Sequence, residues 1–249
     1  MRCLMTKTAT RSSRPRSPSA RNERAMTETR KLAKYLASLG YGSRKEMEVA
    51  IRRGRVTGWG EDVEFDGEPL DPGPGMVILM HKPAGYTCSH QDQGKLVYDL
   101  LPPRFLKRDP KISSVGRLDA DTTGLLLFTD DGALLHRLIS PKSDIPKTYE
   151  ATLARPLEGF EKEFFASGSL ILRGEDKPCL PAELEVTGER TARLTLSEGR
   201  YHQVRRMFAA AGNHVEALHR SRFGPLELGD LSEGAWRLLT EAERAGLAP

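Results

Sequence analysis

Residues 115–129, with the sequence VGRLDADTTGLLLFT, combine one arginine and two carboxylates in a polar turn that leads into an apolar segment. A turn backed by a rigid strand can hold a carboxylate at the rim of a cleft, and Arg117 lies two residues before Asp119. Such a carboxylate can act as a nucleophile or as a general acid or base. The alternative is an Asp-rich turn whose side chains, Asp121 included, cap their own backbone. Spacing alone leaves both interpretations open.

Three further segments place polar side chains where a plain core has no need of them. Lys82 opens the segment KPAGYT, Lys147 and Tyr149 lie in PKTYE, and residues 197–208 have the sequence SEGRYHQVRRMF. In the last segment a glycine ends a strand and a cation-rich helix begins, and the positive end of such a helix suits a phosphate or a carboxylate. Each segment taken singly also fits a strand end, a half-buried aromatic or a surface cation.

The elements that must position these residues follow from hydrophobic periodicity. Mixed strands and helices without regular βαβ alternation predict an α+β fold. We expect strands at 76–80, 125–129, 148–153, 183–186, 192–196 and 215–218, and helices at 131–139, 157–166 and 202–211 and from Thr240 onward.

The basic residues are concentrated in the first quarter of the chain. Residues 1–28 carry seven Lys/Arg and two acids, residues 30–55 carry eight Lys/Arg and two acids, and the net charge of the whole chain is only +4. The remainder is therefore mildly acidic. This asymmetry predicts an N-terminal module that meets a polyanion and a larger body with another task. Residues 1–28 are rich in Ser, Arg, Thr and Pro without apolar periodicity, and we expect a disordered tail.

Two short helices follow the tail. The first ends at Gly40, and the second begins with a capping box formed by Ser43 and Glu46. Cations cluster on the second helix and just after it, which favours contact with nucleic acid, although a solvated helix face is the alternative. These cations are Arg44, Lys45, Arg52, Arg53 and Arg55.

Residues 72–75, of sequence PGPG, form the clearest linker, so we expect a small domain at 29–71 and a large domain at 76–249. No apolar stretch approaches the roughly 18 residues of a membrane span, and no secretory signal is present. Three cysteines and six histidines are scattered without metal-ligand spacing. We therefore expect a cytoplasmic protein with reduced thiols and no metal.

Residues 30–57 and the residues just after them resemble the S4 RNA-binding domain, in the order helix, GYGSR turn, basic helix and GRVT strand. The S4 pattern usually continues into another strand pair. Here residues 58–62 pass quickly to the sequence DGEPL, so we expect a shortened module.

The large domain resembles the pseudouridine synthases of the RsuA/RluA superfamily. The resemblance rests on GRLDADTTGL, KTY and EGRYHQVRRM, and it extends from about residue 77 to the C-terminus. It implies a pseudouridine synthase domain with a mixed, largely antiparallel sheet flanked by helices. Tyr201 and His202 favour the RsuA branch, which modifies 16S rRNA of the small ribosomal subunit, because the related branches that act on 23S rRNA usually have Asn-Arg there.

The resemblance also implies a role for each residue. Asp119 is the catalytic aspartate, Tyr149 stacks on the target uracil, Arg205 pairs with the catalytic carboxylate, and Asp121 supports the turn. Arg117 helps hold the RNA opened by base flipping. The wider set of residues expected to bind RNA comprises Lys82, Lys147, Arg200, His202, Gln203 and Arg206. Local cations are expected to line one face of the large domain, namely Lys82, Arg117, Lys147, Arg200, Arg205, Arg206, Arg220 and Arg222.

The expected partner is 16S rRNA or an assembling small subunit, and the expected state is a monomer without a cofactor. Two other hypotheses stay open. One keeps the chemistry but moves the target to 23S rRNA. The other is a non-catalytic ribosome-assembly factor, which the presence of Asp119, Tyr149 and Arg205 disfavours.

Overall fold

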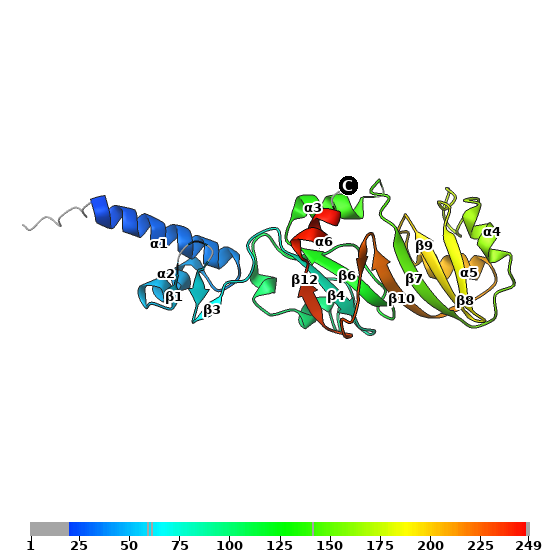
Figure 1. Ribbon diagram of the computed structural model, residues 1–249, viewed down its shortest axis with the longest axis horizontal. Helices are drawn as coiled ribbons and strands as arrows, with labels where there is room; N and C mark the ends of the chain where they lie inside the picture. Colours follow the sequence, from blue (N-terminus) through cyan, green and yellow to red (C-terminus); the bar gives the residue numbers. More distant parts are fainter. Residues whose placement is uncertain (1–19, 59, 61, 141, 248–249) are drawn as a thin grey trace, which may run out of the picture.

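The computed structural model describes residues 20–58, 60, 62–140 and 142–247. A small module of two helices and three short strands lies at one end of an elongated molecule (Figure 1). A single large sheet runs through the rest, with α3 and α6 near β4 and β6, and α4 and α5 near β8 and β9. The large sheet carries the groups singled out by the sequence.

Helix α1 spans Ala20–Ser38 and begins well before the expected start near Arg30. The prediction that the disordered tail extends to residue 28 is therefore wrong for residues 20–28, and residues 1–19 lie outside the described part of the chain. The reason is local: residues 20–28 contain no proline or glycine and many good helix formers, so the helix extends ahead of the apolar positions that begin at Leu32.

Helix α2, Arg44–Arg52, begins at the predicted capping box: the Glu46 amide donates to Ser43 Oγ at 3.3 Å, and the Ser43 amide donates to Glu46 Oε2 at 2.7 Å. Strands β1 (Val56–Thr57), β2 (Glu64–Phe65) and β3 (Glu68–Pro69) then form an antiparallel sheet. The expectation that this module lacks its second strand pair is wrong. Asp66 and Gly67 both adopt positive φ, so a two-residue Asp-Gly turn joins β2 to β3.

The predicted linker has no regular structure, but the large domain holds it. Arg108 and Asp130 are both buried and form an ion pair at 2.9 Å. Arg108 also donates to the carbonyl oxygens of Pro72 and Gly73, and the Gly75 amide donates to Asp130 Oδ1 at 2.8 Å. The segment is therefore anchored to the start of the large sheet.

The large sheet has nine strands, of which seven follow the order β12-β4-β6-β10-β7-β9-β8. Every pair is antiparallel except β6 with β10. The predicted α+β class with a mixed, largely antiparallel sheet is confirmed. The strands are β4 (Val77–Lys82), β5 (Ser113–Ser114), β6 (Thr123–Thr129), β7 (Lys147–Leu153), β8 (Glu183–Gly188), β9 (Thr191–Leu196), β10 (Val215–Phe223), β11 (Leu226–Glu227) and β12 (Trp236–Leu238).

Helices flank this sheet: α3 (Gly132–Ile139), α4 (Glu161–Ala166), α5 (Gln203–Ala210) and α6 (Glu241–Gly246), with short 3-10 helices at Val97–Leu100 and Phe105–Lys107. Asp131 and Thr240 cap α3 and α6. Helix α4 starts later than predicted because Gly159 has φ of 100° and the Glu161 carboxylate accepts the amides of residues 158 and 159. Leu134 and Leu138 of α3 pack in one core cluster, and Val204, Met207 and Phe208 of α5 pack in another.

Gly124 brings β6 and β10 close together at the beginning of the apolar strand. Its φ is 112°, and a Cβ there would lie 2.3 Å from the Arg220 carbonyl oxygen. Only glycine fits this contact. The turn before β6 is thereby fixed beside β10 and, through it, beside β7 and Tyr149. None of the helices in the described ranges is long and apolar enough to cross a membrane.

Candidate active site

A small cleft of about 60 Å³ lies where the turn before β6 meets the loop between β9 and α5. We call residues 117–122 the Asp119 turn and residues 197–202 the β9–α5 loop. The cleft combines charged side chains with an apolar floor. Its lining residues are Arg117, Leu118, Asp119, Thr122, Tyr149, Leu196, Glu198, Gly199, Arg200, His202, Gln203, Val204, Arg205 and Leu218.

Asp119 faces two basic side chains across the cleft. Its Oδ1 lies 3.2 Å from His202 Nε2, and its Oδ2 lies 3.8 Å from Arg205 Nε. Its own carbonyl accepts the Thr122 amide at 3.1 Å, which closes the turn. With its side chain 31% exposed, Asp119 is open to a ligand yet flanked by groups that stabilise a carboxylate.

Arg205 is divided between the two carboxylates of the turn. Its Nη2 donates to Asp121 Oδ2 at 2.8 Å, and its Nη1 donates to the Val215 carbonyl at 2.9 Å. Its Nε is buried without a hydrogen-bond partner in the described chain and is directed at Asp119 over the longer distance. The predicted pairing of Arg205 with Asp119 is therefore present only as a longer ion pair, and Asp121 makes the hydrogen bond that holds Arg205. Hydrogen bonds of this kind often shorten when substrate binds.

His202 lies closer to Asp119 than Arg205 does, a contact that its expected role in RNA binding did not predict. It precedes α5 in a left-handed conformation, with φ of 48°, and its ring stacks on Tyr201 at 3.8 Å. This backbone turn directs the imidazole back toward the cleft. The sequence places His202 at a helix start, but only the turn geometry reveals which side it faces.

Tyr149 supplies the aromatic wall of the cleft. It lies on β7, paired with Arg220 of β10 and Leu194 of β9, and is half-buried against two core clusters. Leu118 and Leu218 line the same cleft. A flat ring beside apolar side chains is suited to stacking on a nucleobase.

Lys82 does not reach the surface. Its side chain is completely buried, and Nζ donates to the carbonyl oxygens of Pro83 at 3.0 Å, Ala120 at 3.2 Å and Thr122 at 2.8 Å. Burial lowers the pKa of this ammonium. The prediction that Lys82 binds RNA is wrong; the ammonium holds the main chain of the Asp119 turn from beneath.

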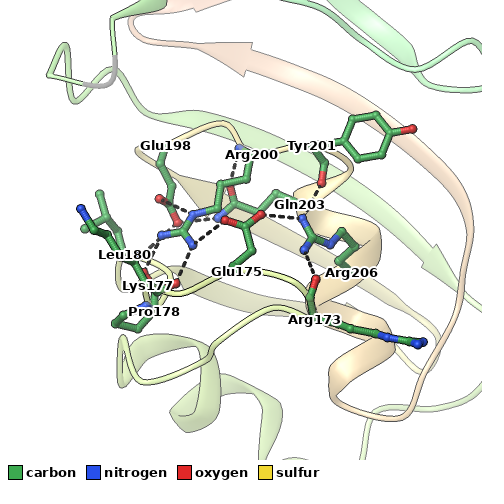
Figure 2. A network of polar contacts seen from close by, with 10 residues as sticks. All are labelled: Arg173, Glu175, Lys177, Pro178, Leu180, Glu198, Arg200, Tyr201, Gln203 and Arg206. Carbon is green, nitrogen blue, oxygen red and sulfur yellow. Dashed lines mark hydrogen bonds and ion pairs between the residues drawn. The ribbon is translucent and has the colours of Figure 1, made fainter.

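Arg200 and Arg206 belong to a network of polar contacts with Glu175 (Figure 2). Arg200 donates to Glu198 at 3.0 Å, to Glu175 at 3.4 Å and to two main-chain carbonyls. Arg206 donates to Glu175 Oε1 at 2.9 Å and to the carbonyls of residues 173 and 201. Both guanidinium groups are thus largely occupied within the protein.

Gln203 completes the same network. It is buried, its Oε1 accepts the Arg200 amide at 2.9 Å, and its Nε2 donates to Glu198 at 2.6 Å. It therefore fixes the end of the β9–α5 loop, directly after His202. Gln203 also lines the cleft, and its contact with RNA stays a prediction.

The remaining predicted cations do not all share one face. Arg117 is exposed and lines the cleft, and Lys147 is half-buried with Nζ donating to the Ile145 carbonyl at 2.8 Å. Arg222, in contrast, is paired with Glu227 and lines a separate groove with Thr148 and His219. The expected single cationic face is wrong for Arg222 and for the buried Lys82.

The N-terminal cations lie on the surface of the small module. Arg44, Lys45 and Arg53 are exposed, and within the described ranges no ion pair involves them. Arg52 donates to the Glu48 carbonyl at 3.2 Å, while Arg55 donates to Asp66 at 2.8 Å. Contact with RNA remains a prediction for these five residues, and three of them offer a wholly available charge.

Over the described residues, no group of three or more His, Cys, Asp or Glu side chains is placed to hold a metal ion. Cys88 and Cys179 are buried free thiols, and burial raises the pKa of both. The groups that converge on the cleft are therefore a carboxylate, a guanidinium, an imidazole and an aromatic ring. They can carry out acid–base or nucleophilic chemistry on a planar, uncharged ring.

This fold and site define an enzyme that modifies a nucleobase in RNA. The family described as RNA pseudouridylate synthase matches residues 76–210, more than half of the chain. The chain belongs to this family and is a pseudouridine synthase.

Its relatives are of the RsuA type, as the motifs predicted. A protein from Pasteurella multocida named ribosomal small subunit pseudouridine synthase A is 45% identical over 188 residues, covering 74% of this chain and 79% of that protein. A protein of the same name from Escherichia coli K12 is 43% identical over 235 residues, covering 87% and 99%. A solved structure described as a pseudouridylate synthase, 39% identical, superposes with a TM-score of 0.66 over 87% of this chain and 99% of that one.

Proposed function

We propose that this enzyme converts one uridine of 16S rRNA, in the small ribosomal subunit, to pseudouridine, with Asp119 as the reacting carboxylate. The observation that carries the proposal is the position of Asp119, within 4 Å of both His202 and Arg205 in a cleft walled by Tyr149. The similarity to small-subunit synthases over most of the chain supports this substrate.

The isomerisation breaks the bond between N1 of uracil and C1′ of ribose, turns the base over, and joins C5 to C1′. The C5 proton leaves, and N1 ends with a proton, so no redox partner is needed. Asp119 acts on the ribose or the base as nucleophile or as general base. Arg205 pairs with the carboxylate and aims it, and Tyr149 stacks on the uracil while the base is detached.

The target base must leave the RNA stack before it reaches Asp119. Arg117 lies exposed at the mouth of the cleft, where it can occupy the opened strand. The exposed cations Arg44, Lys45 and Arg53 add a second contact with the phosphate backbone. The partner is 16S rRNA, free or in an assembling small subunit, and the enzyme acts as a monomer in the cytoplasm.

The decisive experiment maps pseudouridine in 16S and 23S rRNA from a strain that lacks the gene. Loss of one pseudouridine from 16S rRNA, restored by the wild-type chain and not by Asp119→Asn, is the expected result. Loss from 23S rRNA would move the target to the large subunit. A strain that needs the protein for growth but tolerates Asp119→Asn and keeps every modification would indicate an assembly factor instead.

A further inference from the structure

A second cavity, of about 380 Å³, adjoins the Asp119 cleft. The two share Arg117, Tyr149 and residues 198–200 as lining residues. The second cavity is completed by the end of α3, by Lys147 of β7 and by Arg220 and Phe223 of β10. Because Tyr149 borders both spaces, an RNA strand that places its base in the cleft has its backbone within reach of the cavity.

Arg220 is the feature of this cavity that the active site does not explain. It is only 2% exposed, and Nε donates to the Leu125 carbonyl at 2.8 Å, while the guanidinium lies 5.6 Å from the centroid of the Phe223 ring. Its Nη2 is buried and has no hydrogen-bond partner among the described residues. A buried cationic donor without a partner is costly, and such a group in a cavity points to an anionic ligand that completes it.

Lys147 adds a second positive charge to the same space. Its Nζ lies 5.6 Å from the Phe223 ring centroid, and its pKa is lowered by burial and then by the nearby charge of Arg220. The charge of Arg220 is thus near enough to disfavour the charged form of Lys147. An anion between them would relieve that repulsion.

Little negative charge in the cavity opposes these cations. Glu198 lines it, but Oε1 already accepts from the Leu180 amide and Gln203, and Oε2 accepts from Arg200. Asp144 is near enough to Lys147 to act on its charge but does not line the cavity. The available groups in the cavity are therefore cationic donors.

We propose that this cavity binds one phosphodiester group of the substrate RNA strand, next to the target uridine, through Lys147 and Arg220. The inference rests on the proposed function in that the ligand belongs to the same RNA. A phosphate contact fixes the register of a strand without reading its sequence. The cavity would thus hold the backbone while the flipped base lies against Tyr149.

The test is a double-mutant cycle between protein and RNA. The protein carries Asp119→Asn so that the RNA stays unmodified during the measurement. Lys147→Gln is compared with Lys162→Gln, an exposed lysine on α4 outside both cavities. The RNA is a small-subunit fragment containing the mapped uridine, with a neutral methylphosphonate placed in turn at each linkage flanking it, and dissociation constants are measured at one fixed salt concentration.

We expect one linkage at which the methylphosphonate weakens binding by about tenfold in the Lys162→Gln protein and by less than about threefold in Lys147→Gln, because the charge-assisted contact is already lost. Arg220→Gln should show the same non-additivity at the same linkage. If Arg220→Gln does not fold, as thermal unfolding would show, the Lys147 cycle alone decides. Equal effects in both lysine variants at every linkage would overturn the proposal.

Turnover of the unmodified fragment by the wild-type enzyme is measured alongside. If the fragment is modified but the methylphosphonate weakens binding equally in both lysine variants at every linkage, the inference is overturned and the proposed function stands. If one linkage shows non-additivity with Lys147→Gln but the small-subunit fragment is not modified, the cavity is supported as a phosphate site and the proposed target is contradicted.

Discussion

The two loops that meet at the cleft are held in opposite ways. The Asp119 turn is fixed by its main chain: buried Lys82 donates to the carbonyls of residues 120 and 122, and the Gly85 amide donates to the Ala120 carbonyl at 2.7 Å. The side chains of Arg117 and Asp119 are left to line the cleft. The β9–α5 loop is fixed by its side chains, since Glu198 and Arg200 are both engaged in hydrogen bonds.

This difference separates reacting groups from supporting ones. A carboxylate can be both exposed and precisely placed only if something other than its own side chain holds the loop. The Asp119 turn meets that condition through Lys82. In the β9–α5 loop, Glu198 and Arg200 are used for rigidity, so that His202 at its end and Arg205 on the following helix α5 face Asp119. Charged residues that look alike in the sequence therefore differ in function: Lys82, Glu198 and Arg200 support the loops, and Asp119 is left to react.

The largest expected effect distinguishes the two carboxylates of the Asp119 turn. Asp119→Asn should reduce the single-turnover rate of pseudouridine formation by on the order of 10³-fold or more, because it removes the reacting group. Asp121→Asn should reduce it by only about tenfold, since it weakens the hydrogen bond that holds Arg205. Both variants should bind RNA nearly as tightly as wild type. A reversed order of the two rates would assign the chemistry to Asp121.

The second prediction concerns Lys82, which holds the main chain of the Asp119 turn. Lys82→Met keeps the length of the side chain but removes three hydrogen bonds; the carbonyl of Ala120 keeps the Gly85 amide as a donor, whereas those of Pro83 and Thr122 lose the donor from Lys82, so we expect a loss of about 2 kcal/mol in the free energy of unfolding. The turnover rate should fall as well. Chemical denaturation measures the first quantity, and Lys111→Met, at an exposed position, is the control. If both variants were equally stable, Lys82 would have no part in holding the turn.

Much of this architecture could be predicted from local sequence. The capping residues Ser43, Asp131 and Thr240 begin helices where expected, because a capping side chain bonds a backbone amide only two or three residues further along the chain. The apolar stretch of β6 was predicted from local sequence as well. Asp119 and Tyr149 were identified from motifs, and the structure brings them into one cleft.

The remainder depended on contacts between distant residues. Lys82 follows an apolar strand and looks like a surface cation, but its partners lie 38 and 40 residues away. Strand β12 is three residues long and is defined only by its pairing with β4. Whether Arg200 and Arg206 are available for RNA depends on Glu175, which lies in a different loop and belongs to no motif.

A smaller effect tests the frame of the β9–α5 loop. Glu175→Gln weakens the ion pairs with Arg200 and Arg206, so we expect a loss of about 1 kcal/mol in the free energy of unfolding. The turnover rate should fall several-fold while RNA affinity changes little, because His202 ends this loop and Arg205 lies on the helix α5 that follows it. Glu163→Gln, on the exposed side of α4, is the matched control. A normal rate for Glu175→Gln would show that the network stabilises the fold without aligning the cleft.

The smallest effect compares a free arginine with an engaged one. Arg117 is exposed beside Asp119, whereas Arg206 is paired with Glu175 at 2.9 Å. If Arg117 neutralises a phosphate of a single strand, Arg117→Gln should reduce the slope of log affinity against log salt concentration by about 0.7. Arg206→Gln should leave the slope unchanged, because its charge is already balanced within the protein. Measuring RNA affinity from low to moderate salt checks both, and a larger slope change for Arg206→Gln would mean that RNA competes successfully with Glu175 for that guanidinium.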